Sequence, residues 1–204
     1  MDMGLSRLQN AVVDMANLAQ QSVMKAIEAY AKGERITQEA FKRSNELSLL
    51  ASEVEDLAVE LLARYQPVAT DLRFIKSCLE IAYGFSRFGR YAYDIAQVLE
   101  VYGDLSECDK SVVQDLSGTV TKMIQTSIQS FKTRDEKLAR SLREDDDHVD
   151  KAYMDYNREL SKAPSIPIRC AVASLLVLRY LERIADHACY IGDSVIYITT
   201  AAKV

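Results

Sequence analysis

The chain has 204 residues, of which 49% are hydrophobic and 27% are charged, and its formal net charge is −5. This hydrophobic share is large enough to build a core, so the composition excludes an intrinsically disordered chain. The negative charge argues against nucleic acid as the main ligand, because phosphate binding requires a basic surface. No apolar run of about 18 residues is present, so we expect no membrane-spanning helix.

The turn residues and the apolar period predict six long helices. The chain has only 7 glycines and 3 prolines, and its apolar residues recur at the three- and four-residue spacing of one α-helical face. Pro67, Pro164 and Pro167 stand where helices are expected to begin, and Gly33 and Gly103 stand where helices are expected to end. The predicted helices are residues 4–32, 35–65, 68–102, 109–132, 134–162 and 165–201.

The second half of the chain repeats the pattern of the first half. Residues 85–92 (FSRFGRYA) align with residues 181–188 (LERIADHA). Short links between long helices place consecutive helices antiparallel. The sequence therefore predicts an all-α fold, a tandem pair of three-helix bundles with domains at residues 1–105 and 106–204. Chance similarity between amphipathic helices is the alternative to a true repeat.

Two acidic pairs in the second half are candidates for a metal site. Glu182 and Asp186 are four residues apart and share one helix face, and Asp146 and Asp150 have the same spacing. If antiparallel helices bring the pairs together, the four carboxylates repel one another unless cations neutralise them. Oxygen ligands suit magnesium, manganese, calcium or iron better than they suit a thiolate zinc site.

The acidic pairs are compatible with more than one kind of structure. Glu182 and Asp186 could lie on a solvated helix face and pair with Arg179 and Arg183. A ferritin-like di-iron centre needs a Glu-x-x-His motif on two helices, and this motif is missing after Glu182. His187 points about 100° away from Asp186 around the helix, so we expect it beside the site rather than as a ligand.

The cysteines and histidines suggest no catalytic site. Cys78, Cys108, Cys170 and Cys189 are widely spaced and form no CxxC motif, which predicts buried free thiols in a reducing cytosol. Residues 1–4 (MDMG) lack the pattern of a signal peptide, which also favours a cytoplasmic protein. With two histidines and no Ser-His-Asp or Cys-His grouping, acid–base catalysis is poorly supplied.

The repeats resemble the PhoU family of phosphate-uptake regulators. Residues 67–73 (PVATDLR) are similar to the family's P-x-A-x-D-L-R motif, and residues 181–191 (LERIADHACYI) to its L-E-R-I-G-D-H-A-x-x-I motif. Residues 195–197 (VIY) resemble the end of the family's sequences. The resemblance covers nearly the whole chain and implies two tandem three-helix bundles.

The resemblance also implies acidic E/D-x-x-x-D pairs, which in the family hold metal clusters. The second repeat matches these positions with Asp146, Asp150, Glu182 and Asp186, whereas the first repeat has Ser44, Ser48, Ser86 and Arg90 there. We therefore expect one metal site per chain, in the second bundle, holding iron, zinc, manganese or magnesium. Arg90 is expected to supply a cation in the first bundle and to bond to Ser44 or Ser48.

By its resemblance the protein is expected to be a cytoplasmic regulator that acts by protein contact. The implied partners are a phosphate transporter subunit at the membrane and a sensor kinase, with membrane association only through them, and a homodimer is left open. Tyr91 and Tyr93, beside Arg87 and Arg90, offer a polar aromatic surface, with core packing as the alternative. A metal-dependent phosphate-binding protein or metalloenzyme, and a metal-free adaptor of a secondary phosphate transporter, are the alternative functions.

Overall fold

The computed structural model describes residues 1–162 and 166–202. It contains six helices, α1 (Asp2–Lys32), α2 (Thr37–Tyr65), α3 (Ala69–Tyr102), α4 (Ser111–Thr133), α5 (Glu136–Leu160) and α6 (Ile168–Thr200). The predicted all-α fold is confirmed, and every helix starts and ends within three residues of its predicted position. None of the six helices, as far as the structure describes them, contains an apolar stretch that could span a bilayer.

Glycine and proline mark the helix ends as predicted. Gly33 and Gly103 end α1 and α3 with φ of 75° and 70°, a left-handed backbone that glycine adopts without a steric cost. Pro167 precedes the first residue of α6, and Pro67 lies two residues before α3. Pro164, expected at a helix start, lies outside the described residues.

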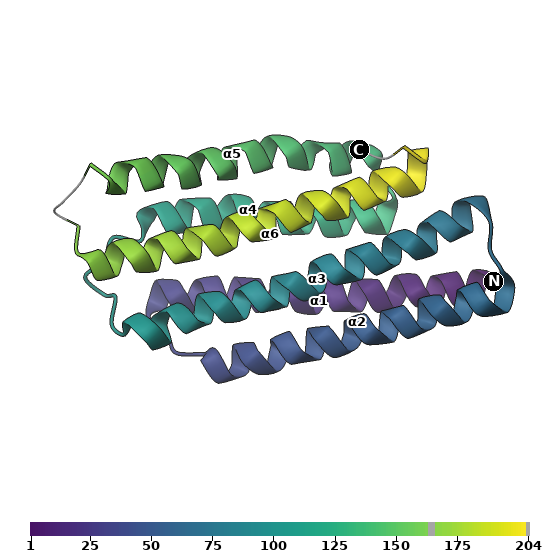
Figure 1. Ribbon diagram of the computed structural model, residues 1–204, viewed down its shortest axis with the longest axis horizontal. Helices are drawn as coiled ribbons and strands as arrows, with labels where there is room; N and C mark the ends of the chain where they lie inside the picture. Colours follow the sequence, from purple (N-terminus) through teal and green to yellow (C-terminus); the bar gives the residue numbers. More distant parts are fainter. Residues whose placement is uncertain (163–165, 203–204) are drawn as a thin grey trace.

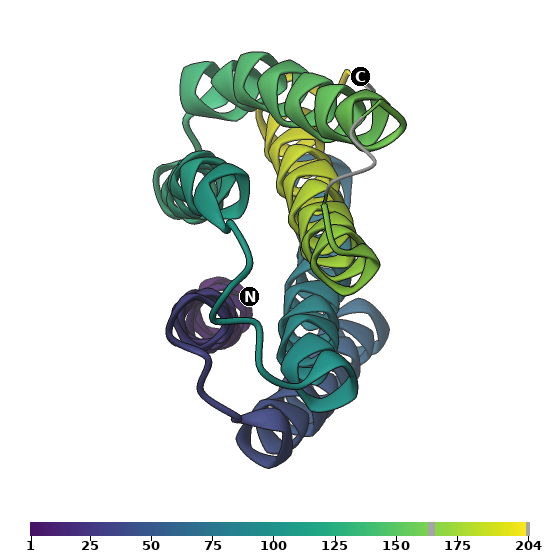
Figure 2. The same ribbon diagram turned by 90° about the vertical axis from the view of Figure 1, so that its left-hand side faces the viewer.

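The helices run lengthwise beside one another, as Figure 1 shows. In the end-on view of Figure 2, α3 and α6 lie side by side, with α2 and α5 beyond them and α1 and α4 on the other side. Helices α3 and α6 contact each other extensively, and α1 also contacts α4. The two repeats are therefore joined along their length, and the division at residues 105 and 106 stays a prediction.

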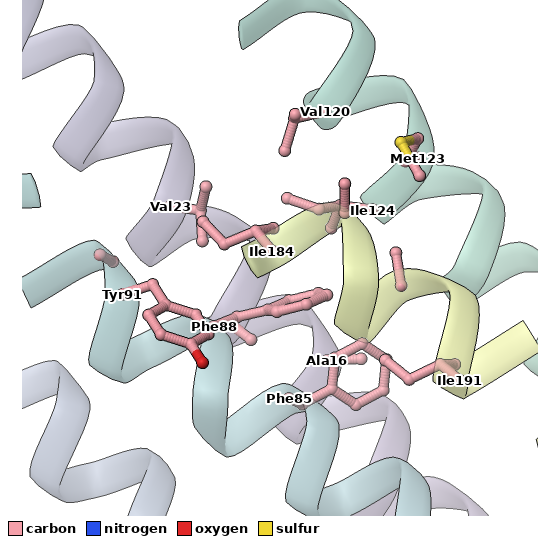
Figure 3. Packing of buried hydrophobic residues seen from close by; sticks show 14 of the residues in the cluster. Ala16, Val23, Phe85, Phe88, Tyr91, Val120, Met123, Ile124, Ile184 and Ile191 are labelled. Carbon is pink, nitrogen blue, oxygen red and sulfur yellow. The ribbon is translucent and has the colours of Figure 1, made fainter. Parts of the chain in front are cut away.

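The hydrophobic core continues across the junction of the repeats. Phe85 and Phe88 of α3 and Ile184 of α6 are fully buried there. Val23 of α1 and Ile124 of α4 close the same cluster, as Figure 3 shows. Burying side chains of this size contributes about 1.5–3 kcal/mol each, so separation of the repeats would expose a costly apolar surface.

Two of the cysteines differ from the prediction of free thiols. Cys108 in the α3–α4 connection and Cys170 in the first turn of α6 form a disulfide, whereas Cys78 and Cys189 are buried free thiols. The prediction is wrong for Cys108 and Cys170 because the connection between the repeats folds back onto the start of α6. Two cysteines 62 residues apart give no sign of this proximity in the sequence.

Loss of this disulfide is expected to destabilise the protein. The bond closes a loop of 62 residues, and a loop of that length corresponds to about 4 kcal/mol of unfolding free energy in the chain-entropy model. Cys108→Ser should lower the urea midpoint, and dithiothreitol should lower that of the wild type but leave that of the variant unchanged. A wild-type transition that ignores the reductant would contradict this prediction.

Candidate metal centre

The acidic residues of α5 and α6 meet where these two helices pack together. Helix α5 is mostly polar, and its buried residues are Ala139, Leu142 and Val149. Asp146 lies four residues after Leu142 and three before Val149, on the same face of the helix. Burial of this narrow apolar stripe against α6 therefore turns Asp146 toward α6.

Three carboxylates come together at this seam. Asp146, Asp150 and Asp186 each offer an oxygen, and these oxygens all lie within 4.8 Å of one another. Burial raises the pKa of Asp146 to about 6, and the charges of Asp150 and Asp186 add to the effect. The pKa of Asp150 is also raised, first by burial and then by Asp186. The cluster thus combines partial burial with like-charge repulsion.

Glu182 lies outside that group of three but close to it. Arg179 Nη1 donates a hydrogen bond of 2.6 Å to Glu182 Oε1, and Arg183 Nη1 donates one of 3.1 Å to Asp186 Oδ2. Burial, and next the charge of Asp186, raises the pKa of Glu182. The ion pairs with Arg179 and Arg183 therefore form, and they coexist with the carboxylate cluster.

Two buried oxygens of the site lack a hydrogen bond from any described residue, although Arg183 Nε lies 3.7 Å from one of them, Glu182 Oε2. In the part of the chain that the structure describes, the buried atoms Asp146 Oδ1 and Glu182 Oε2 have no hydrogen-bond partner. Such atoms cost free energy unless water or a cation satisfies them. Three converging carboxylate oxygens and these unpaired atoms fit a cation that prefers oxygen ligands.

Two neighbours of the cluster were not predicted from the sequence. Cys189 lies near Asp146, and burial together with that carboxylate raises the pKa of its thiol, so the thiol stays protonated in the metal-free protein. Arg143 Nη2 lies 2.6 Å from Asp193 Oδ2 and links α5 to α6 at one end of the cluster. The sequence does hold a signal for Arg143, since Arg143 and Asp146 are three residues apart and share a helix face.

His187 faces α3 instead of the carboxylates. Its ring contacts those of Tyr83, Tyr91 and Tyr190 at centroid distances of 6.0, 5.8 and 5.5 Å. Burial lowers the pKa of His187 to about 4, and the charges of Arg87 and Arg183 act in the same direction. The imidazole is therefore uncharged at neutral pH and packs among aromatic rings.

The equivalent positions of the first repeat hold no carboxylate cluster. Ser48 Oγ donates to the Ser44 carbonyl at 3.1 Å, and Ser86 Oγ donates to the carbonyl one turn before it at 2.7 Å. Arg90 pairs with Asp94 at 3.3 Å and stacks over the ring of Tyr93 at 5.4 Å. The expected bond from Arg90 to Ser44 or Ser48 is wrong, because Asp94 lies one turn away on the same helix.

The described residues thus define an all-helical protein of two three-helix repeats with a carboxylate cluster in the second. A model of the PhoU domain matches residues 12–99 and 113–195. The chain belongs to the PhoU family, and the resemblance found in its motifs is confirmed.

Relatives match along nearly the whole chain. The phosphate-specific transport system accessory protein PhoU homolog of Aquifex aeolicus is 32% identical over 200 residues, covering 96% of this chain and 90% of the relative. The PhoU homolog 1 of Methanothermobacter thermautotrophicus is 31% identical, covering 81% of this chain and 78% of the relative. The crystal structure of PhoU from Pseudomonas aeruginosa superimposes with a TM-score of 0.89 at 26% identity, over 98% of this chain and 99% of that one. PhoU from Streptococcus pneumoniae, at 20% identity, shares the fold with a TM-score of 0.92 over 100% of this chain and 98% of that one.

Asp146→Asn is expected to stabilise the metal-free protein at pH 7. The unfolded chain releases this proton near pH 3.9 and the folded chain near pH 6. Between these two pH values, ionisation of Asp146 progressively lowers the free energy of unfolding. Above the folded pKa the full destabilisation is present. Because Asp146 is partly exposed, we expect a gain of about 1 kcal/mol in the variant at pH 7 and none near pH 4. Urea denaturation of chelated protein measures both values.

Asp147→Asn is the matched control, since Asp147 is exposed on the same helix and is not one of the three clustered carboxylates. An equal gain in the control, or a gain that persists at pH 4, would contradict the role of Asp146.

Proposed function

We propose that the protein regulates phosphate uptake by direct contact with a phosphate transporter. Both halves of the chain match the PhoU domain, and this observation carries the proposal. Its relatives are named as accessory proteins of phosphate-specific transport systems. The site residues supply no nucleophile with an adjacent base, which favours a regulator over an enzyme.

We further propose that Asp146 and Asp150 from α5, and Asp186 from α6, hold a metal ion. Glu182 can complete the ligand set through its Oε2, which accepts no hydrogen bond from the described residues and lies 3.7 Å from Arg183 Nε, since its other oxygen already accepts a hydrogen bond from Arg179. When bound, the ion supplies the positive charge that offsets repulsion among the carboxylates. Iron, zinc, manganese and magnesium are the candidates, and the oxygen ligands favour the harder ions among them.

Ligands from two helices would give the metal a mechanical role. Helix α5 has few buried residues. Its packing on α6 therefore depends on the polar contacts around the carboxylates more than on a wide apolar face. Shared ligation at the seam ties α5 to α6 and fixes the outer surface of the second repeat. A partner that recognises this surface then loses less entropy in ordering it.

The partner is proposed to be a phosphate transporter subunit at the membrane, and in addition a sensor kinase. The protein is proposed to act in the cytoplasm and to reach the membrane only through these partners. One metal site per chain follows from the loss of carboxylates at Ser44, Ser48, Ser86 and Arg90.

A metal-free adaptor is the second candidate, and one observation favours it. Arg179 and Arg183 already neutralise part of the charge on Glu182 and Asp186. If these arginines suffice, α5 docks on α6 without an ion, and the transporter contact is independent of metal.

Binding to the phosphate-specific transporter encoded in the same genome tests the proposal. With the purified transporter in lipid nanodiscs, we expect the metal-loaded wild type to bind by interferometry, and chelation or Asp186→Asn to weaken binding about tenfold, or about 1.4 kcal/mol. Asp147→Asn serves as the control and should bind as the wild type does. Equal affinity with and without metal would favour the metal-free adaptor, and no binding in any state would contradict the transport role.

A further inference from the structure

A groove of about 690 Å³ lies between α3 and α6. Tyr83 of α3 and Tyr190 of α6, named here the groove tyrosines, line it together with Leu79, Gly84 and His187. A Cβ at Gly84 would lie 3.0 Å from Ile191 of α6, so this glycine allows the two helices to approach closely at the groove. The groove therefore belongs to the packing of α3 on α6 and to no mobile loop.

The groove tyrosines are exposed, and both pack against His187. Tyr83 is 60% exposed and Tyr190 is 55% exposed. Each ring contacts the ring of His187, at interplanar angles of 64° and 84°, which are the edge-to-face arrangements that aromatic pairs prefer. Exposed tyrosines are typical of binding surfaces, because a side chain with two χ angles loses little entropy when a partner covers it.

Lysine and arginine side chains lie over neighbouring aromatic rings on the same two helices. Lys76 Nζ lies 5.3 Å from the centroid of the Tyr197 ring, and Arg87 Cζ lies 4.9 Å from that of Tyr91. Among the described residues, no lysine or arginine is stacked on either groove tyrosine. The groove tyrosines thus carry no stacked cation from the described part of the chain, whereas other rings on these two helices do.

The charged residues that line the groove are acidic. Glu80 and Asp193 line it, and none of its described lining residues is a lysine or an arginine. Glu80 pairs with Lys76, and Asp193 pairs with Arg143, but both cations have side chains that are about half exposed. The pair of Lys76 with Glu80 is about half exposed on both sides and contributes little, so Glu80 can also accept hydrogen bonds from an incoming cation.

We propose that this groove binds an arginine or lysine side chain from the transporter's water-facing surface, an inference that rests on the proposed function. Aromatic faces flanked by carboxylates recognise a guanidinium or ammonium group through cation–π contact and charge-assisted hydrogen bonds. The net charge of −5 favours a basic partner. Short cytoplasmic loops of membrane proteins carry an excess of lysine and arginine, and so they match this chemistry.

Titration with N-acetyl-arginine N-methylamide tests the groove without the transporter. The neutral citrulline analogue has nearly the same shape and is the matched ligand control. With isotope-labelled tyrosine, we expect the arginine probe to shift the ring signals of Tyr83 and Tyr190 saturably, and the citrulline probe to bind about fivefold more weakly or worse. Equal shifts from both probes, or none from arginine, would overturn the proposal.

Variants separate ring recognition from loss of fold. Calorimetry follows binding to variants that lack the tyrosine signals. Tyr83→Phe and Tyr190→Phe keep the π faces and should retain arginine binding, whereas Tyr83→Ala with Tyr190→Ala should abolish it. Tyr65→Ala removes an exposed tyrosine from the end of α2 and should leave binding unchanged. Arginine binding that survives the double alanine variant would refute the assignment of the cation to this groove.

The transporter assay then separates this inference from the proposed function. We expect the double alanine variant to bind the transporter in nanodiscs at least tenfold more weakly than the wild type. Equal binding of variant and wild type would overturn the groove's role while leaving the proposed function intact. If the wild type does not bind the transporter, the proposed partner is wrong, and the claim that the groove is a transporter contact falls with it.

Discussion

The packing of α3 against α6 is the contact on which the rest of the molecule depends. It joins the repeats through fully buried side chains such as Phe85, Phe88 and Ile184. It also gives α6 two different faces, since α6 contacts α3 on one side and α5 on another. The carboxylates of Glu182 and Asp186 belong to the α5 side, and His187 belongs to the α3 side. One helix therefore contributes to both the carboxylate cluster and the aromatic groove.

The two repeats differ in the charged and polar side chains at their equivalent positions. In the second repeat, carboxylates converge, their pKa values rise, and two buried oxygens accept no hydrogen bond from the residues that the structure describes, which is an arrangement that favours a cation. In the first repeat, the serine hydroxyls donate hydrogen bonds to backbone carbonyls of their own helices, and Arg90 pairs with Asp94. The first repeat, which has no carboxylates at these positions, therefore has no comparable repulsion to offset.

Local signals in the sequence predict the helices and the acidic pairs well. Gly33 and Gly103 determine helix ends through their own backbone freedom, and the four-residue spacing of Glu182 and Asp186 determines their shared face. The disulfide of Cys108 with Cys170 depends on how a connection folds back, which no local pattern encodes. The groove tyrosines were missed for a similar reason, because Tyr83 and Tyr190 meet only where α3 crosses α6.

The location of bound metal tests the account most directly. Crystals of the protein reconstituted in turn with Mn²⁺, Fe²⁺ and Zn²⁺ give anomalous difference maps that place each ion without assumptions about its ligands. We predict a peak among the carboxylates of Asp146, Asp150 and Asp186, where oxygens from two helices lie within 4.8 Å of one another. No peak at this seam with any of the three ions, or a peak beside Ser86 and Arg90, would contradict the account.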